Sequence, residues 1–409
     1  MTFLAMAAQH GVRTLIGFVN SAPAAWTTDH KSCGGRLIPG TEAAYANYLS
    51  SVVAYLHDAD HITLSYVSPV NEPDASQPTC RQEGMVVPVD QRASLVKAVA
   101  SALAKHAPYA HVIADESSLV ADQLLPETPQ WLSTPGAASS VAVIAHHTYD
   151  YPPMPVLRDV AQLGGHFHKP LWASEICCRN YTGFGYQYDP TMTSGIWLAN
   201  TIWGDLTQAG DSAFDWWTAL SPRLGCNPAA DPACVNQVNP AGRNDALLYY
   251  DPASSLDHNE TIYTTKRYFV LGNFSRYVRP GAVLHNVSGV PAGTRAVAFS
   301  AKDGWSVVVI NDSPVGTAPT KFTLHIPLGG RALSPVSAVR TSDSLNLGPT
   351  ALPRYRAGTM TASLEPHSVT TYVFTTSGSR GRVTTAAAER SGGAGASSQR
   401  VGLVKTRTG

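Results

Sequence analysis

The sequence of 409 residues lacks an excess of charge of either sign, because Lys and Arg together number 29 and Asp and Glu together also number 29. Charged residues make up only 14% of the chain. Without a net electrostatic field, neither nucleic acid nor an anionic membrane surface is favoured as a partner. We therefore expect no nucleic acid partner, and a neutral substrate cleft that contains aromatic side chains.

Long apolar runs are missing as well. No stretch approaches the roughly 18 to 20 apolar residues that a membrane helix needs. The start of the chain, MTFLAMAAQHGVRTLIGFVN, lacks the basic region, the apolar stretch and the small-residue cleavage site of a signal peptide. We expect neither a membrane span nor an export signal in this chain.

Cysteine is scarce, and its placement is informative. All six cysteines lie in the first 240 residues, mostly in loops rich in Gly, Pro and Asn. An even number of cysteines in loops indicates disulfides and an oxidising compartment. We predict a bridge from Cys226 to Cys234 that closes the loop CNPAADPAC, and we leave the pairing of the others open: Cys33, Cys80, Cys177 and Cys178. A metal site is disfavoured because no pair has CxxC spacing.

The first 280 residues alternate between apolar strands and segments with helical spacing. Strands are expected at 14–20, 62–70, 111–116, 141–150, 170–175 and 213–220. Helices are expected at 41–58, 90–107, 154–164, 193–210 and 261–278, with a loop-rich helical segment between the strands 111–116 and 141–150. Six strand–helix units with apolar strands predict a parallel sheet covered by helices.

A closed parallel barrel has eight such units, so two strands would have to precede Met1. The alternative is an open doubly wound sheet. No strand is followed by a GxGxxG or GxxxxGK[ST] turn, which disfavours nucleotide binding. We expect no cofactor.

After Pro280 the pattern changes to short alternating segments rich in Val and Thr, separated by turn signals such as KDGW and PLGG. We predict an all-β sandwich over residues 281–376, after an incomplete TIM-type barrel over residues 1–280. The tail from 377 to 409 has almost no large apolar residues, so we expect it to be disordered.

Chemistry in parallel barrels is built at the carboxyl ends of the strands. Glu72 follows ITLSYVSPVN and Glu175 follows KPLWAS, while His147 and Tyr149 close the strand VAVIAHHTYD. Trp216 and Trp217 close AFDWW. Glycoside hydrolysis requires two carboxylates across a sugar-sized gap, and tryptophan faces provide a platform for a pyranose.

Plainer interpretations exist for several of these residues. A carboxylate at the end of a strand often caps the next helix, but the helix after Glu72 starts well downstream. Glu175 has Arg179 close by in the chain as an ion-pair partner. Asp115 and Glu116 are expected to be helix-start or solvated residues. Because side chains alternate along a strand, one residue of the pair His146 and His147, and one tryptophan, should serve ordinary packing.

The motif SPVNEPD, followed by WASE later in the chain, resembles glycoside hydrolase clan A. More narrowly, the chain resembles family 30, in which a β-sandwich side domain ends in a segment like LEPHSVTTYVF (364–374). FVNSAPAAW (18–26) and HTY (147–149) are similar to two further motifs of that family. CRQEG (80–84) resembles its endo-β-1,6-galactanase branch.

The resemblance implies a retaining double displacement on a β-linked polysaccharide. Glu72 would be the acid/base and Glu175 the nucleophile, with a protonated Glu72 and an ionised Glu175. Asn71 would bind the 2-hydroxyl of the sugar, and Tyr149 would orient Glu175. Substrate contacts are further expected from Asn20, Trp26, His147, and Trp216 or Trp217.

By the same resemblance the chain starts near the third barrel strand. The first two units are absent, and with them an arginine that the clan places near the nucleophile. We therefore expect the chain alone to express poorly or to lack activity. Endo-β-1,6-galactanase action on arabinogalactan side chains is the favoured activity, from a monomer whose full-length parent is extracellular. The alternatives are a β-1,6-glucanase, a β-glucosidase or glucosylceramidase-like enzyme, a xylanase, or an inactive carbohydrate-binding homologue.

Overall fold

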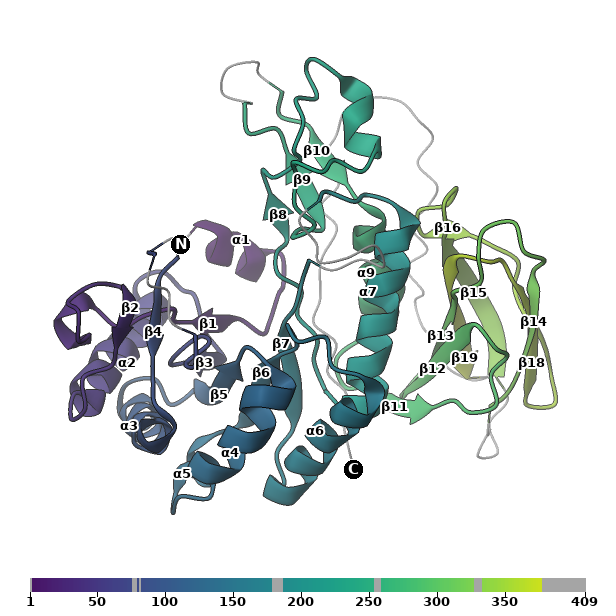
Figure 1. Cartoon of the computed structure of the whole chain (residues 1–409). Coiled ribbons are helices and arrows are strands. Elements are labelled where there is room, and N and C mark those ends of the chain that lie inside the picture. The colour runs from purple at the N-terminus through teal and green to yellow at the C-terminus, as the bar shows by residue number, and fades with distance from the viewer. Residues whose placement is uncertain are drawn as a thin grey trace. The chain divides into compact units, whose positions relative to one another are not determined.

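The computed structural model describes residues 2–75, 79–80, 82–178, 187–253, 259–326 and 333–376. The chain packs as two compact units (Figure 1). Unit 1 comprises residues 1–176 and 204–216, and unit 2 comprises 177–203 and 217–409. The expected disordered tail, 377–409, lies outside the described residues, and the expected domain limits at 280 and 376 stay predictions.

Unit 1 is built on a parallel sheet in the order β1-β3-β5-β6-β7. Its strands are β1 (Ile16–Phe18), β3 (Tyr66–Ser68), β5 (His111–Ser117), β6 (Val143–His147) and β7 (Leu171–Glu175). A parallel bridge between Ala173 and Phe214 adds a sixth segment beside β7. All of β6 is buried, as expected for a parallel strand covered on both faces. The carboxyl ends of the strands therefore meet at one edge of the curved sheet.

The longer helices of unit 1 follow these strands along the chain: α2 (Glu42–Asp58), α3 (Val89–His106), α4 (Leu125–Leu132) and α6 (Met154–Phe167). The helix α2 shows why they cover the sheet. Its buried residues Tyr45, Leu49, Val53 and Leu56 recur at helical spacing and form one apolar stripe. This stripe belongs to the same hydrophobic core as residues of β3 and β5.

Shorter elements complete unit 1. They include the helices α1 (Thr2–Gln9) and α5 (Ala137–Ser140) and the short helical turns η1 (Ala24–Trp26), η2 (Val120–Leu124) and η3 (Asp205–Ala209). The strand β2 (Cys33–Arg36) pairs in parallel with β4 (Gly84–Val86), and a disulfide joins Cys33 to Cys80 beside this pair. The pair lies in the loop regions that follow β1 and β3 along the chain.

Unit 2 contains most of α7 (Met192–Gly204), α9 (Lys266–Ser275), the turn η4 (Pro232–Asn236) and a small sheet. The small sheet has the order β10-β9-β8, with β8 (Leu220–Ser221), β9 (Leu248–Tyr250) and β10 (Ile262–Thr264). Two expectations are wrong here. The strand expected over 213–220 is only a bridge at Phe214, because Leu220 pairs with Leu248 of β9. The helix expected from 261 begins at Lys266, because β-branched residues before it pair with β9.

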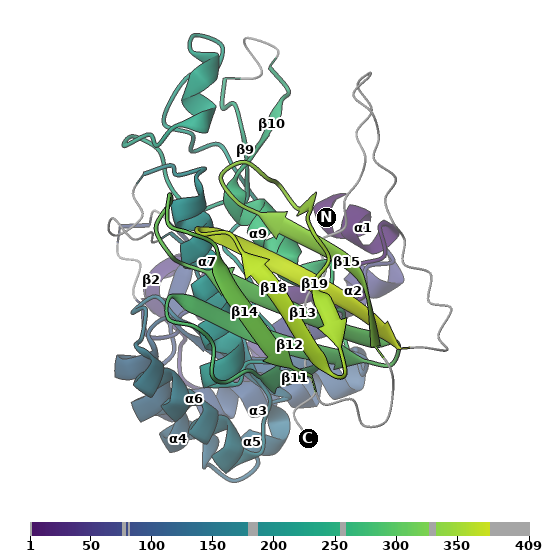
Figure 2. The same cartoon turned by 90° about the vertical axis from the view of Figure 1, so that its right-hand side faces the viewer.

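The C-terminal part of unit 2 is an antiparallel sandwich, seen face on in Figure 2. One sheet has the order β11-β12-β13-β19-β15-β16 and the other the order β14-β18-β17. The strands are β11 (Val283–Asn286), β12 (Thr294–Ala301), β13 (Gly304–Asn311), β14 (Thr320–His325), β15 (Leu333–Thr341), β16 (Gly348–Pro349), β17 (Arg354–Arg356), β18 (Thr359–Leu364) and β19 (Ser368–Thr376).

Inward-facing residues of both sheets form one core, for example Val307, Phe322 and Tyr372. The strand β14 alternates as the sequence pattern after Pro280 predicts, whereas β13 and β19 are buried along most of their length. Among the described residues, every helix is too short or too polar to cross a bilayer.

Candidate active site

Glu72 and Glu175 both lie at carboxyl ends of the parallel sheet of unit 1. Glu175 is the last residue of β7, and Glu72 follows β3 in a loop that Tyr45 supports by donating its hydroxyl to the Pro69 carbonyl at 2.8 Å. The backbone of Glu72 is left-handed, with φ of 46°, and its N–H donates to the Glu116 carbonyl at 3.1 Å. This turn directs the carboxylate back across the sheet edge.

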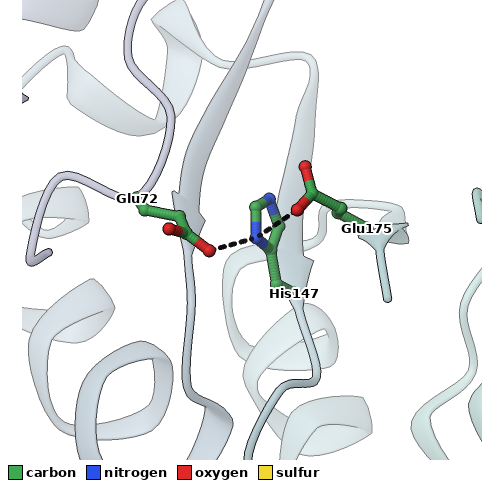
Figure 3. A group of neighbouring side chains, drawn as sticks. All are labelled: Glu72, His147 and Glu175. Carbon is green, nitrogen blue, oxygen red and sulfur yellow. Dashed lines mark hydrogen bonds and ion pairs between the residues drawn. The ribbon is translucent and has the colours of Figure 1, made fainter. Parts of the chain in front are cut away.

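The two carboxylates meet at the imidazole of His147, as Figure 3 shows. Nδ1 of His147 lies 3.2 Å from Oε1 of Glu72 and 3.8 Å from Oε1 of Glu175. The atoms that the three side chains present to one another lie within 4.8 Å. Retaining glycosidases hold their two carboxyl groups about 5 to 5.5 Å apart, whereas inverting enzymes need roughly 6.5 to 9.5 Å. The spacing fits the retaining geometry.

His147 is a buried cation. Burial by itself would lower the pKa of the imidazole, but the carboxylates of Glu175, Glu116 and Glu72 outweigh it and raise the pKa to about 10. Both ring nitrogens are then N–H donors at neutral pH. Within the described residues, Glu72, His147 and Glu175 are the group whose atoms lie close enough to share a metal ion. A protonated imidazole has no lone pair for a metal, so the set is better suited to proton chemistry.

Opposing effects act on the carboxyl group of Glu175. Burial raises its pKa above the ordinary value, and the charge of His147 and a hydrogen bond from Tyr149 lower it by less, so that the pKa stays raised. The Tyr149 hydroxyl donates to Oε1 of Glu175 at 2.7 Å. Its ring lies edge-on to His147, with ring centroids 5.7 Å apart. Tyr149 keeps its own proton, because burial and the charge of Glu175 raise its pKa. His147 and Tyr149 thus offset part of the cost of burying the ionised form of Glu175.

Glu116 is the residue of this site whose importance the sequence did not indicate. The expectation that Asp115 and Glu116 are helix-start or solvated residues is wrong, because both are buried. Oε2 of Glu116 lies 3.5 Å from Nε2 of His147 and accepts a hydrogen bond from the Ser174 hydroxyl. The signal was its position directly after the apolar run HVIA, at the same sheet edge as Glu72 and Glu175.

Asp115 points the other way and supports the strand from behind. Its Oδ2 accepts hydrogen bonds from Nη1 of Arg92 and Nε1 of Trp131, both at 2.8 Å. Arg92 also pairs with Glu127 at 2.8 Å. This buried ion-pair cluster fixes the end of β5, the strand that carries Glu116.

The prediction that His146 and His147 face opposite sides is confirmed. Nε2 of His146 lies 3.1 Å from Oδ1 of the buried Asp211. The carboxylates of Asp211 and Asp205 raise the pKa of His146 against the effect of burial. This second buried pair anchors the strand on the face away from Glu72 and Glu175.

The remaining expected substrate contacts are less closely grouped. Asn71 is buried, and its Oδ1 has no hydrogen-bond partner among the described residues. Asn20 is half-buried, and Trp26 packs against Tyr45 and Tyr48. Trp216 is half-buried in unit 1, whereas Trp217 belongs to unit 2 and is 49% exposed. The role of these side chains as substrate contacts stays a prediction.

All six cysteines are paired. The predicted bridge between Cys226 and Cys234 is confirmed, and the pairs left open are Cys33–Cys80 and Cys177–Cys178. Arg179, considered as a partner for Glu175, lies outside the described residues.

Comparison with known proteins agrees with this geometry. Residues 1–128 match the family model of O-glycosyl hydrolase family 30. The fold is shared with the family 30 subfamily 8 xylanase Xyn30A from Clostridium acetobutylicum, at 22% identity and a TM-score of 0.68, covering 91% of this chain and 83% of that one. Xylanase C from Talaromyces cellulolyticus is also similar, at 22% identity and a TM-score of 0.69, over 91% and 79% of the two chains.

An endo-β-1,6-glucanase shares the fold as well, at 16% identity and a TM-score of 0.63, over 88% of this chain and 71% of that one. In this chain the paired carboxylates lie at the carboxyl edge of a parallel β/α sheet, and a β-sandwich follows later in the sequence. The family model thus covers the first 128 residues, and the solved structures extend the similarity in fold over most of the chain. The expected fold class, an incomplete TIM-type barrel with an all-β side domain, is confirmed.

Proposed function

We propose that this glycoside hydrolase cleaves β-1,6-galactan side chains of arabinogalactan in endo fashion, with Glu72 as acid/base and Glu175 as nucleophile. The observation that carries the catalytic part is the convergence of both carboxylates on His147 within 4.8 Å. Support for the sugar comes from CRQEG, which resembles the galactanase branch and begins at Cys80, the residue bonded to Cys33.

The reaction proceeds in two displacements. Glu72 donates its proton to the leaving glycosidic oxygen while a carboxylate oxygen of Glu175 attacks the anomeric carbon. The ionised Glu72 then removes a proton from water, which attacks the glycosyl-enzyme ester and releases Glu175. The product keeps the β configuration, because inversion occurs twice.

His147 and Tyr149 serve the two carboxylates in this scheme. The Nδ1 proton of His147 faces both Glu72 and Glu175, so it stabilises whichever of them carries the negative charge. Tyr149 orients the attacking oxygen of Glu175. Asn71, the residue before Glu72 in the chain, would bind the sugar 2-hydroxyl in this proposal. Asn20, Trp26, and Trp216 or Trp217 would hold the rest of the chain of sugars.

A stereochemical assay tests the proposal. The protein is incubated with β-1,6-galactan, β-1,6-glucan and glucuronoxylan in separate reactions, and proton NMR follows the anomer first released. We expect release of β-anomeric galacto-oligosaccharides, and loss of turnover in Glu175→Gln. Asp159→Asn, which changes an exposed carboxylate on α6, is the matched control and should retain activity.

Glu72→Ala provides the second arm. Since this variant lacks the base for water, added azide should restore turnover of an aryl glycoside and give a β-glycosyl azide. An α-anomeric product, or a Glu175→Gln variant as active as the wild type, would refute the assigned roles. Retained binding of galactan without hydrolysis in the wild type would identify a carbohydrate-binding homologue instead.

A β-1,6-glucanase is the second candidate activity, because an endo-β-1,6-glucanase shares the fold and acts on the same type of linkage. The substrate panel separates it from the galactanase and from a xylanase. The three disulfides support an extracellular location for the protein.

A further inference from the structure

A cavity of about 390 Å³ lies within unit 2 and has no part in the chemistry described above. Four segments far apart in the sequence line it: the start of α7, the turn η4, the junction from β10 to α9, and the loop after β15. None of its lining residues is among those assigned to hydrolysis. Its size falls in the range of small-molecule sites, roughly 300 to 1,000 Å³.

The walls of this cavity are tied together by Lys266. Its Nζ donates to the Ser342 carbonyl at 2.5 Å, to the Leu345 carbonyl at 3.2 Å and to Oδ1 of Asn346 at 2.8 Å. Its backbone N–H donates to the Pro190 carbonyl at 3.0 Å. One residue therefore links three of the four segments, and a ligand would meet a preformed site with little ordering cost.

The starts of α7 and α9, which line the cavity, are also held together by hydrogen bonds. The guanidinium of the buried Arg267 donates to the Asp189 carbonyl at 2.7 Å and to the Ala246 carbonyl at 2.5 Å. The hydroxyl and the N–H of Thr191 both donate to Oδ1 of Asp189. These bonds hold the start of α7 against the start of α9, so the cavity is a lasting feature of unit 2.

The polar groups that remain free in the cavity are mostly uncharged. Among the described residues, the side-chain amide of Asn236 and the hydroxyl of Thr264 have no hydrogen-bond partner, and both residues are exposed. Asn346 accepts from Lys266 through its oxygen, which leaves its NH₂ group as a donor. The half-buried Phe269 adds an apolar ring to the lining.

The charges in the cavity exclude several ligand classes. All three N–H donors of Lys266 are used within the protein, so its ammonium group has no donor left to bind a phosphate or carboxylate directly. The carboxylate of Asp343 would repel an anion, although His367 lies 3.1 Å from it. Amides and a hydroxyl would be left unpaired by a purely apolar ligand. A neutral ligand with many hydroxyl groups satisfies all of these groups.

We infer that this cavity is a second saccharide-binding site, which holds a neutral mono- or disaccharide segment. The asparagine amides and Asp343 pair with sugar hydroxyls, and the ring of Phe269 packs against a sugar face. The inference rests on the proposed glycoside hydrolase function but not on the choice of galactan. A second site on one chain would raise the apparent affinity for a polymer by multivalency without changing the chemistry.

Ligand stoichiometry tests this inference on the full chain. Glu175→Gln is used throughout to prevent hydrolysis, and β-1,6-galactobiose, β-1,6-glucobiose and xylobiose are titrated by calorimetry. We expect two binding events per chain for at least one disaccharide. Combining Glu175→Gln with Phe269→Ala should remove one event, or weaken it by roughly tenfold, the loss expected for a ring contact worth up to 1.5 kcal/mol.

Two further variants keep the test decisive. Thr264→Val removes only an exposed hydroxyl, so it should weaken the same event even if Phe269→Ala fails to fold. Phe3→Ala truncates an aromatic side chain that is 76% exposed on α1, and it should change nothing. A single binding event in every variant, or two events that Phe269→Ala and Thr264→Val both leave unchanged, would overturn the inference. If galactobiose fails and another disaccharide binds twice, the galactanase proposal fails while the second site stands.

Discussion

Glu116→Gln removes the buried carboxylate that faces Nε2 of His147 and leaves its shape in place. In the wild type, Oε2 of Glu116 lies 3.5 Å from Nε2 of His147, and the pKa of His147 is raised to about 10. Two unit charges about 4 Å apart interact by about 4 kcal/mol at an effective dielectric constant of about 20. At 1.36 kcal/mol for each factor of ten, this change lowers the pKa of His147 from about 10 to about 7.

The direction of the pKa shift of His147 decides the pH range in which its ion pairs stabilise the protein. Because the folded protein holds the pKa of His147 above its ordinary value, the stabilisation from its carboxylates is present below about pH 6.5 and is lost as the pH rises through about 10. In Glu116→Gln the loss occurs near pH 7. A neutral imidazole no longer stabilises the charge on Glu175, so kcat should fall above neutral pH while KM changes little.

Nitrogen-15 NMR of the histidine rings measures this directly, and the spectrum of His147→Asn identifies the resonance. We expect His147 to stay protonated to at least pH 9 in the wild type and to titrate near pH 7 in Glu116→Gln. Glu127→Gln, which removes a half-buried carboxylate from Arg92 instead, should leave the titration unchanged. If His147 in Glu116→Gln still titrates near pH 10, Glu116 is not its counter-charge.

Three further changes test the site and the scaffold. Tyr149→Phe removes a hydrogen bond to the charged carboxylate of Glu175, which is worth about 1.5 to 3 kcal/mol. The pKa of Glu175 should then rise, and the acidic side of the pH profile of kcat/KM should move up by about one to two pH units. An unchanged pH profile would show that Tyr149 does not tune the pKa of Glu175. Arg92→Ala leaves Asp115 buried without its cation and should cost about 3 to 5 kcal/mol in guanidinium unfolding, and a loss under about 1 kcal/mol would contradict the structural role of the pair. Replacing Cys226 and Cys234 together by Ser should lower the free energy of unfolding by about 2 to 3 kcal/mol, seen as a lower Tm; no change in Tm would mean that this loop is already ordered without its bridge.

Local patterns in the sequence determined much of this protein. The apolar strands, the helical stripes and the Val- and Thr-rich alternation after Pro280 are short-range signals, so the order of elements followed from them. The sequence also predicted that Glu72 and Glu175 lie near each other, because both follow parallel strands, whose carboxyl ends meet at one edge of the sheet. The bridge from Cys226 to Cys234 was predictable because it closes a short loop.

Long-range packing decided the rest. The pairing of Cys33 with Cys80 joins residues 47 positions apart, and the pairing of β10 with β9 replaced the start of a helix. Glu116 is the clearest case, because its backbone is left-handed, with φ of 60°, and the alternation of a regular strand does not predict where such a side chain points. Only the folded sheet brought it to Nε2 of His147, since a charge becomes buried only where a partner from another strand compensates it.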